Sequence, residues 1–267
     1  MTHRLSVIGC GNMGRAIVRG LLESGWTTPE RIVATNPDPE KAFRIESDLG
    51  IRCITDNQAA AAQGDVVLLG VKPQVIKGAL KDLRGTVRPS QLVVSIAAGI
   101  STRFIEYYTA ETPVVRSMPN LSVTIGMGAT AICPGSYAKR EHLELAKEIF
   151  LAVGSVEEVA EMHMDAVTGL SGTGPMYVFT MLEALADAGV KMGLPRGVAS
   201  RLAAQTVRGA AWLSQETDMH PAALKDLVTS PGGTAITALH VLRRNAFDAI
   251  VMDAVEAATR RAAELGE

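Results

Sequence analysis

The sequence lacks the excess of basic residues that nucleic-acid binding requires. Its 26 lysines and arginines stand against 28 aspartates and glutamates, which gives a net charge of -2, and the basic residues are scattered along the chain. A phosphate backbone is attracted by a clustered basic patch. We therefore expect no nucleic-acid partner.

Cysteine is scarce, and its spacing is not that of a structural site. Cys10, Cys53 and Cys133 are odd in number and far apart. None of them lies in a spacing typical of a disulfide framework or a zinc site. The five histidines also stand alone. We expect buried free thiols in a reducing compartment and no bound metal.

Long hydrophobic runs are also missing. No apolar run approaches the ~20 residues that cross a bilayer. The chain starts with a strand-like segment rather than with a basic and then apolar leader. Both observations favour a cytoplasmic protein without a membrane partner.

Apolar segments of strand length alternate with segments of helical periodicity over the first 160 residues. The predicted strands are Arg4–Ile8, Arg31–Thr35, Val66–Val71, Leu92–Ile96, Val114–Met118, Ala129–Ile132 and Val156–Val159. The predicted helices are Asn12–Leu22, Glu40–Leu49, Val75–Leu83, Thr102–Tyr108 and Glu141–Ala152. Such alternation is typical of a parallel sheet covered by helices. We predict an α/β Rossmann-type domain over residues 1–160, with a doubly wound, mostly parallel sheet.

Helical patterns fill the rest of the chain. The predicted helices are Tyr177–Lys191, Arg196–Gln215, Pro221–Val228, Ala235–Arg243 and Phe247–Glu264. Gly193 and Pro195 end the first of them, because glycine caps a helix and proline cannot continue it. The apolar face is large for so small a domain, which favours burial against a second subunit. We predict an all-α domain over residues 161–267 and a homo-oligomer.

A glycine pattern, Gly9-x-Gly11-x-x-Gly14, lies between the first predicted strand and the first predicted helix. The first glycine permits a tight turn, the second lets the backbone approach a pyrophosphate, and the third lets helix and strand pack closely. The N–H groups of the helix N-terminus then face the phosphates. The pattern predicts a dinucleotide site.

The second predicted strand ends at Thr35 without the carboxylate that usually binds the ribose hydroxyls of NAD. The first acidic residue after it is Asp38. Because a carboxylate repels a 2′-phosphate, its absence favours NADPH over NADH. Thr35 and Asn36 can donate to that phosphate, and an ordinary Asn-Pro turn is the alternative interpretation.

Three later strand ends belong to the same edge of the predicted sheet. They are Val71-Lys72-Pro73, Ala97-Ala98-Gly99 and Met118-Pro119-Asn120. Lys72 either contacts a phosphate or ribose of the cofactor or is a solvated lysine before a turn. The other two segments are expected to wall the nicotinamide, because small residues let the ring lie close to the backbone.

Two glycine-rich segments interrupt the helical half. Ser230-Pro231-Gly232-Gly233-Thr234 precedes a predicted helix, so its free N–H groups form a carboxylate site without an arginine. The hydroxyls of Ser230 and Thr234 add donors, and a plain N-cap turn is the alternative. The same argument applies more weakly to the predicted loop Ser171–Pro175.

The sequence has no signature of acid–base or nucleophilic catalysis, since its histidines are isolated and Glu157-Glu158 is typical of a solvated face. Hydride transfer needs less of this apparatus, because the cofactor carries the chemistry and the protein aligns donor and acceptor carbons. The combination favours a reductase.

Six segments, read together, resemble the pyrroline-5-carboxylate reductase family. They are Gly9–Gly14, Val71–Pro73, Arg116–Asn120, Asp165–Pro175, Val190–Pro195 and Ser230–Thr234. The resemblance implies NAD(P)H-dependent reduction of the cyclic imine 1-pyrroline-5-carboxylate to L-proline, the final step of proline biosynthesis. It also implies a Rossmann domain and a helical dimerisation domain, with dimers often assembled into decamers.

The resemblance further implies roles for the residues that match the family's motifs. The matching cofactor positions are Gly9, Gly11, Asn12, Met13, Gly14, Asn36, Val71, Lys72, Pro73, Ala97 and Asn120. The substrate positions are Ser230, Gly232, Gly233 and Thr234.

One position departs from the family pattern. The family commonly has a threonine two places after Gly233, where its hydroxyl reaches the imine nitrogen, but this chain has Ala235. Thr234 stands one residue earlier, on a different face of the helix. Thr234 is the candidate catalytic residue, and a bound water or protonation of the imine by solvent are the alternatives.

Other functions stay open on the sequence alone. A reductase of another cyclic imine and a β-hydroxyacid dehydrogenase share the two-domain plan. The second family has a lysine followed four residues later by asparagine, whereas Lys191 and Lys225 are followed by Pro195 and Thr229. A non-catalytic NADPH-binding sensor is the third hypothesis, favoured by Ala235 and opposed by the intact loop from Ser230.

Overall fold

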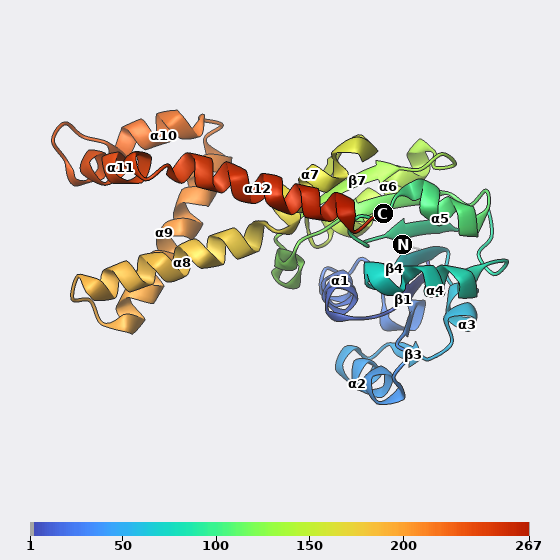
Figure 1. The fold of residues 1–267 in the computed structure, drawn as a ribbon. Coiled ribbons are helices and arrows are strands. Elements are labelled where there is room, and N and C mark those ends of the chain that lie inside the picture. Colours follow the sequence, from blue (N-terminus) through green and yellow to red (C-terminus); the bar gives the residue numbers. More distant parts are fainter. Residues whose placement is uncertain (1–2, 267) are drawn as a thin grey trace. The chain divides into compact units, whose positions relative to one another are not determined.

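The computed structural model describes residues 3–266, which form two compact units (Figure 1). The first, here called the sheet unit, contains the chain up to Gly174 together with the segment from Glu256 onward. The second, the helical unit, is Pro175–Val255.

The sheet unit is built on one eight-stranded sheet of order β3-β2-β1-β4-β5-β6-β7-β8. The strands are β1 (Leu5–Ile8), β2 (Ile32–Thr35), β3 (Arg52–Ile54), β4 (Val66–Leu69), β5 (Leu92–Ser95), β6 (Val114–Met118), β7 (Gly128–Pro134) and β8 (Gly154–Glu158). Among the strand pairs within residues 3–266, only β6–β7 is antiparallel. The prediction of a doubly wound, mostly parallel sheet is confirmed. Its strand order reverses between β1 and β4, and ligands bind at the carboxyl ends of strands at such a switch point.

Helices cover both faces of this sheet. They are α1 (Asn12–Glu23), α2 (Pro39–Leu49), α3 (Asn57–Ala61), α4 (Pro73–Leu83), α5 (Thr102–Thr109), α6 (Arg140–Leu151) and α7 (Met164–Val167). Ile17 of α1 and Phe150 of α6 pack in one apolar core, whereas Ile76 of α4 and Ile105 of α5 pack in the other. Neighbouring strand residues point to opposite cores, because side chains alternate along a strand.

The sequence patterns did not predict β3 and α3. β3 has three residues, of which Cys53 alone is fully buried, so it shows no apolar run. α3 spans five residues and begins where the Asp56 carboxylate accepts the N–H groups of Gln58 and Ala59, at 2.9 and 3.0 Å. A cap of this kind specifies the start of a helix, but so short a helix has no visible periodicity.

The helical unit is all-α, as predicted. Its helices are α8 (Gly174–Lys191), α9 (Arg196–Glu216), α10 (Pro221–Val228), α11 (Thr234–Arg244) and α12 (Phe247–Glu264). Gly193 has φ +95°, the left-handed conformation that ends α8 where the sequence predicts it. Within residues 3–266, no helix combines the length and the apolar character needed to cross a membrane.

The two units differ from the predicted ranges 1–160 and 161–267. Residues 161–174 belong to the sheet unit, where the buried Arg116 of β6 binds Asp165 at 3.0 Å. The end of α12 also returns to the sheet unit.

The predicted loop Ser171–Pro175 is wrong. Thr168–Gly172 forms a π-helical turn that leads into α8, and Thr173 N–H donates to Thr168 O at 2.9 Å. The hydroxyls of Thr168 and Ser171 also bond to carbonyls of the preceding turn. Alternating glycine and hydroxyl residues are typical of a loop. Here the hydroxyls donate to backbone carbonyls of the preceding helical turn, which is compatible with a helix.

Candidate active site

The glycine turn between β1 and α1 leaves room where a dinucleotide needs it. Gly9 has φ +81°, and a side chain there would overlap Val71. A Cβ at Gly14 would lie 3.4 Å from Val7 Cγ1, so α1 packs directly on β1. A Cβ at Gly11 would meet nothing within 4 Å, and Gly11 is exposed. The space above Gly11 is therefore open to a ligand.

The N-terminus of α1 fits an anion. Its N-cap, Gly11, supplies no side-chain acceptor, and the first turn holds no acidic residue. The N–H groups of Asn12 and Met13 have no acceptor within the helix, and the helix dipole adds positive potential there. These backbone groups suit a pyrophosphate.

Thr35, at the end of β2, holds the glycine turn in place. Its Oγ1 accepts the Gly9 N–H at 2.9 Å and donates to Asn57 Oδ1 at 2.8 Å. The Thr35 carbonyl also accepts the Cys10 N–H at 2.7 Å. Because this hydroxyl is buried and already used, it supports the dinucleotide turn rather than a phosphate.

Asn36 is the residue of this strand end whose side chain is left partly exposed. Its Oδ1 accepts the Asp38 N–H at 3.1 Å, which leaves the amide NH₂ as the donor side. Asp38 caps α2, and its hydrogen bonds to Lys41 and Glu40 hold the pKa of that carboxyl below its usual range. Asp38, the first acidic residue after β2, therefore uses its carboxylate to cap the N-terminus of α2.

The ends of β4 and β5 lie beside the glycine turn. Gly70 N–H donates to Ile8 O at 2.9 Å, which places Val71 next to Gly9. Lys72 is exposed and precedes α4, which starts with Pro73. Leu69 pairs with Ser95, so the buried Ala97 follows on the next strand. The structure therefore brings the predicted cofactor positions of three neighbouring strands to one edge.

Asn120 follows β6 and is mostly buried, with 8 % of its surface exposed. Its Oδ1 accepts the N–H groups of Ser122 and Ala129, at 3.1 and 3.2 Å. Its Nδ2 donates to Ser171 O at 3.1 Å. Asn120 therefore joins the end of β6 to the π-helical turn.

A polar network around the buried Arg116 was missed by the sequence reasoning. The Arg116 side chain is 6 % exposed and lies 3.0 Å from Asp165 and 3.6 Å from Glu161. Glu161 in turn accepts the N–H and the hydroxyl of Thr102, both at 2.7 Å. The one sequence feature that indicates this network is Arg116 itself, a charged residue within an apolar strand.

The Ser230–Thr234 loop lies in the helical unit and is mostly exposed. Gly232 has φ +68°, and Gly233 N–H donates to Ser230 O at 3.1 Å. A Cβ at Gly233 would overlap Ser230 Oγ. The positive φ at Gly232 therefore favours glycine, and the absence of a side chain at Gly233 leaves room for the Ser230 hydroxyl beside the N-terminus of α11.

α11 begins at Thr234, one residue earlier than predicted, with Gly233 as its N-cap. No acidic residue lies in its first turn, so the N–H groups of Thr234 and Ala235 are open to a carboxylate. Successive helical residues are rotated by about 100°. The exposed Thr234 side chain therefore leaves α11 in a different direction from that of position 235.

The three cysteines are free and buried. Burial raises the pKa of Cys10 and of Cys133 to about 12, and that of Cys53 to about 11. All three are therefore inert thiols at neutral pH. Across residues 3–266 no group of three histidine, cysteine or acidic side chains has a metal-binding arrangement.

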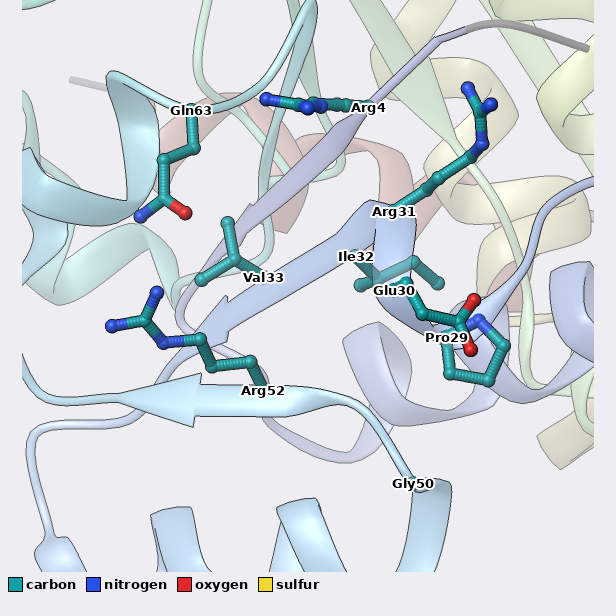
Figure 2. A pocket seen from close by; sticks show the side chains of 9 residues that line it. All are labelled: Arg4, Pro29, Glu30, Arg31, Ile32, Val33, Gly50, Arg52 and Gln63. Atoms are coloured by element: carbon teal, nitrogen blue, oxygen red, sulfur yellow. The ribbon is translucent and has the colours of Figure 1, made fainter.

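A cavity of about 330 Å³ lies at the opposite end of β1 and β2 from the glycine turn (Figure 2). Arg4 precedes β1 and Arg52 opens β3, and both line the cavity with Val33 between them (Figure 2). None of the predicted site residues lines it. Its place at the amino ends of the strands separates it from the cofactor edge.

Comparison with known proteins gave matches over the whole chain. Residues 161–265 match the family model for pyrroline-5-carboxylate reductase dimerisation, and residues 4–99 match one described as NADP oxidoreductase, coenzyme F420-dependent. The pyrroline-5-carboxylate reductase of Synechocystis is 46 % identical, with all of each chain covered. The enzyme of Methanosarcina acetivorans is 44 % identical over 99 % of this chain and 98 % of its own.

Solved structures agree with these matches. A pyrroline-5-carboxylate reductase from Coxiella burnetii superimposes with a TM-score of 0.92 at 36 % identity, and both chains are covered completely.

Proposed function

The chain belongs to the pyrroline-5-carboxylate reductase family, and from this premise we infer that it reduces 1-pyrroline-5-carboxylate to L-proline. It is an oxidoreductase that acts on a C=N bond and completes proline biosynthesis. The observation that carries this conclusion is a family likeness that spans both units of the chain.

The cofactor is NADP(H), and NADH is an alternative donor. When bound, its nicotinamide supplies the hydride. We propose that the N–H groups of Asn12 and Met13 bind the pyrophosphate above Gly11. Asn36 donates its amide to the 2′-phosphate, Lys72 adds positive charge, and Ala97 leaves space for the ring. The open space at Gly11 and the capped carboxylate of Asp38 support these assignments.

We propose that the turn before α11 holds the carboxylate of the substrate. The N–H groups of Thr234 and Ala235 and the hydroxyl of Ser230 donate to it, while Gly232 and Gly233 give the turn its shape. Since this site uses backbone donors and a helix dipole, it needs no arginine. The ring of the substrate is thereby oriented by its carboxylate.

The proton for the imine nitrogen is assigned to Thr234 in this proposal. Its hydroxyl is exposed at the first position of α11 and has no assigned role in the fold. Delivery by a bound water, or protonation of the imine by solvent before binding, are the alternatives.

Substitution of Gly233 tests the two-site assignment. Gly233→Val places a side chain against Ser230 Oγ and is expected to raise the KM for pyrroline-5-carboxylate at least tenfold, with the Kd for NADPH nearly unchanged. Gly209→Ala, on α9 with open space around it, is the matched control. Equal loss of substrate and cofactor binding in Gly233→Val would contradict the assignment.

The homo-oligomer is formed by the helical unit in this proposal. The centre of the proposed subunit interface is a groove of about 760 Å³ lined by apolar side chains of α8, α11 and α12. We further propose that dimers assemble into a decamer, which light scattering of the purified protein tests. The three free thiols support a location in the reducing cytoplasm.

A further inference from the structure

The segment Ala262–Gly266 packs against the backbone that follows β5. A Cβ at Gly99 would lie 2.7 Å from the carbonyl oxygen of Ala262 and 3.0 Å from the backbone nitrogen of Gly266. A Cβ at Gly266 would overlap the carbonyl oxygen of Gly99. The two segments therefore touch backbone to backbone, and glycine is required on both sides.

The segment that contacts Gly99 has an ordered conformation. Ala262, in the last turn of α12, is 2 % exposed. Beyond the helix, Leu265 N–H donates to Arg261 O at 3.2 Å and Gly266 N–H donates to Ala263 O at 3.0 Å. The segment Ala262–Gly266, here called the C-terminal seat, thus has a defined conformation within the sheet unit.

The seat contacts the same short segment that carries a predicted cofactor position. Ala97 is two residues before Gly99, and Ile96 N–H donates to Leu69 O at 3.2 Å, which places this segment beside the end of β4. Gly99 has φ +75°, a conformation that glycine enters and leaves easily. Without a contact on its outer side, this turn has more freedom to lose when a ligand orders it.

We propose that the C-terminal seat is a positioning element for the dinucleotide: it holds the Ala97–Gly99 turn in the conformation that receives the nicotinamide. The inference rests on the proposed function, because it assigns Ala97–Gly99 to the cofactor. Ala262 and Gly266 act through the turn and not on the reacting atoms. Their loss weakens cofactor binding and leaves the rate at saturating cofactor nearly unchanged.

Two variants test this role. Gly266→Ala places a methyl group against Gly99 O, and a chain that ends at Glu264 removes the contacts of Leu265 and Gly266 without introducing a clash, so that only the contact of Ala262 is left. For both, the expected Kd for NADPH, measured by its fluorescence, rises about three- to tenfold. The KM for NADPH rises in parallel, while kcat and the KM for pyrroline-5-carboxylate change less than twofold.

Two control variants separate positioning from general effects. Glu264→Gln removes an exposed ion pair with Arg261 at the same end of the chain, and Gly78→Ala adds a methyl group to α4 in open space. Both are expected to bind NADPH like the parent.

An unchanged Kd for NADPH in both seat variants would overturn the inference and leave the proposed function intact. A fall in Tm and active fraction with unchanged Kd would also overturn it, because that result indicates a merely structural role. Failure of the parent chain to bind NADPH would overturn the inference together with the proposed function.

Discussion

Gly9 and Gly11 lie two residues apart, but the structure constrains them differently. Gly9 combines a positive φ with direct contact to Val71, so replacing it strains the fold itself. Gly11 has neither constraint, and its lack of a side chain keeps the space above the turn open. Stability and cofactor binding should therefore separate between these positions.

Gly11→Ala is expected to raise the Kd for NADPH at least tenfold, because its methyl group occupies the approach of the pyrophosphate, while Tm stays within about 2 °C. Gly9→Ala is expected to lose NADPH binding and about 1–3 kcal/mol of the free energy of unfolding. Fluorescence titration and urea denaturation measure both quantities. A stable Gly9→Ala protein, or normal NADPH binding by Gly11→Ala, would contradict this reading of the turn.

Thr234 is the second residue whose role is separable from the fold. If its hydroxyl delivers the proton, Thr234→Ala lowers kcat about 100-fold with little change in the KM for either substrate, and Thr234→Ser retains most of kcat. Thr237→Ala is the control, because the Thr237 hydroxyl bonds to Gly233 O at 3.1 Å. Steady-state kinetics decide the point, and an unchanged kcat in Thr234→Ala would assign the proton to water or solvent.

At the scale of the elements, the Arg116 network ties β6 to α5 and α7. Arg116→Met leaves the partly exposed carboxylates of Glu161 and Asp165 without their cation, so the free energy of unfolding is expected to fall by about 3 kcal/mol. Urea denaturation measures this change. Arg140→Met, which removes an exposed arginine from its pair with Glu158, is the control and should change stability by less than about 1 kcal/mol. Equal effects of the two substitutions would contradict a structural role for the network.

The elements also show what sequence periodicity can predict. Long amphipathic helices such as α6 and strands buried on both faces such as β4 follow from their patterns. An amphipathic helix has an apolar residue at every third or fourth position, and a strand buried on both faces is a continuous apolar run. The π-helical turn at Thr168–Gly172 could not be predicted, since the hydroxyls that favour loops here bond backward along the helix. The Asn120 bond to Ser171 was equally invisible, because the partners are 51 positions apart.

At the scale of the whole molecule, the motifs predict candidate site residues in both units, and the predicted cofactor positions at the ends of β1, β4 and β5 lie at one sheet edge. The unit boundary was less predictable. Residues 161–174 and the end of α12 both belong to the sheet unit, because they contact residues that are distant in the sequence. Neither contact leaves a local pattern in the sequence.

The apolar groove of the helical unit carries the prediction for assembly. Ile250 on α12 lines this groove and is 60 % exposed in the single chain. Ile250→Asp is expected to convert the homo-oligomer to monomer, because an ionised carboxylate cannot be buried in an apolar interface without a partner. NADPH binding by the sheet unit should persist. Sedimentation velocity measures the assembly, with Asp253→Asn on the same helix as control, and an intact oligomer in Ile250→Asp would place the interface elsewhere.

The most direct test of the central claim follows the absorbance of NADPH after addition of pyrroline-5-carboxylate, with proline measured as the product. A parallel reaction contains 3-hydroxyisobutyrate and NADP. The account predicts rapid NADPH oxidation with one proline formed for each NADPH consumed, and no reaction in the parallel sample. NADPH binding without turnover of pyrroline-5-carboxylate would contradict it, as would oxidation of 3-hydroxyisobutyrate in its place.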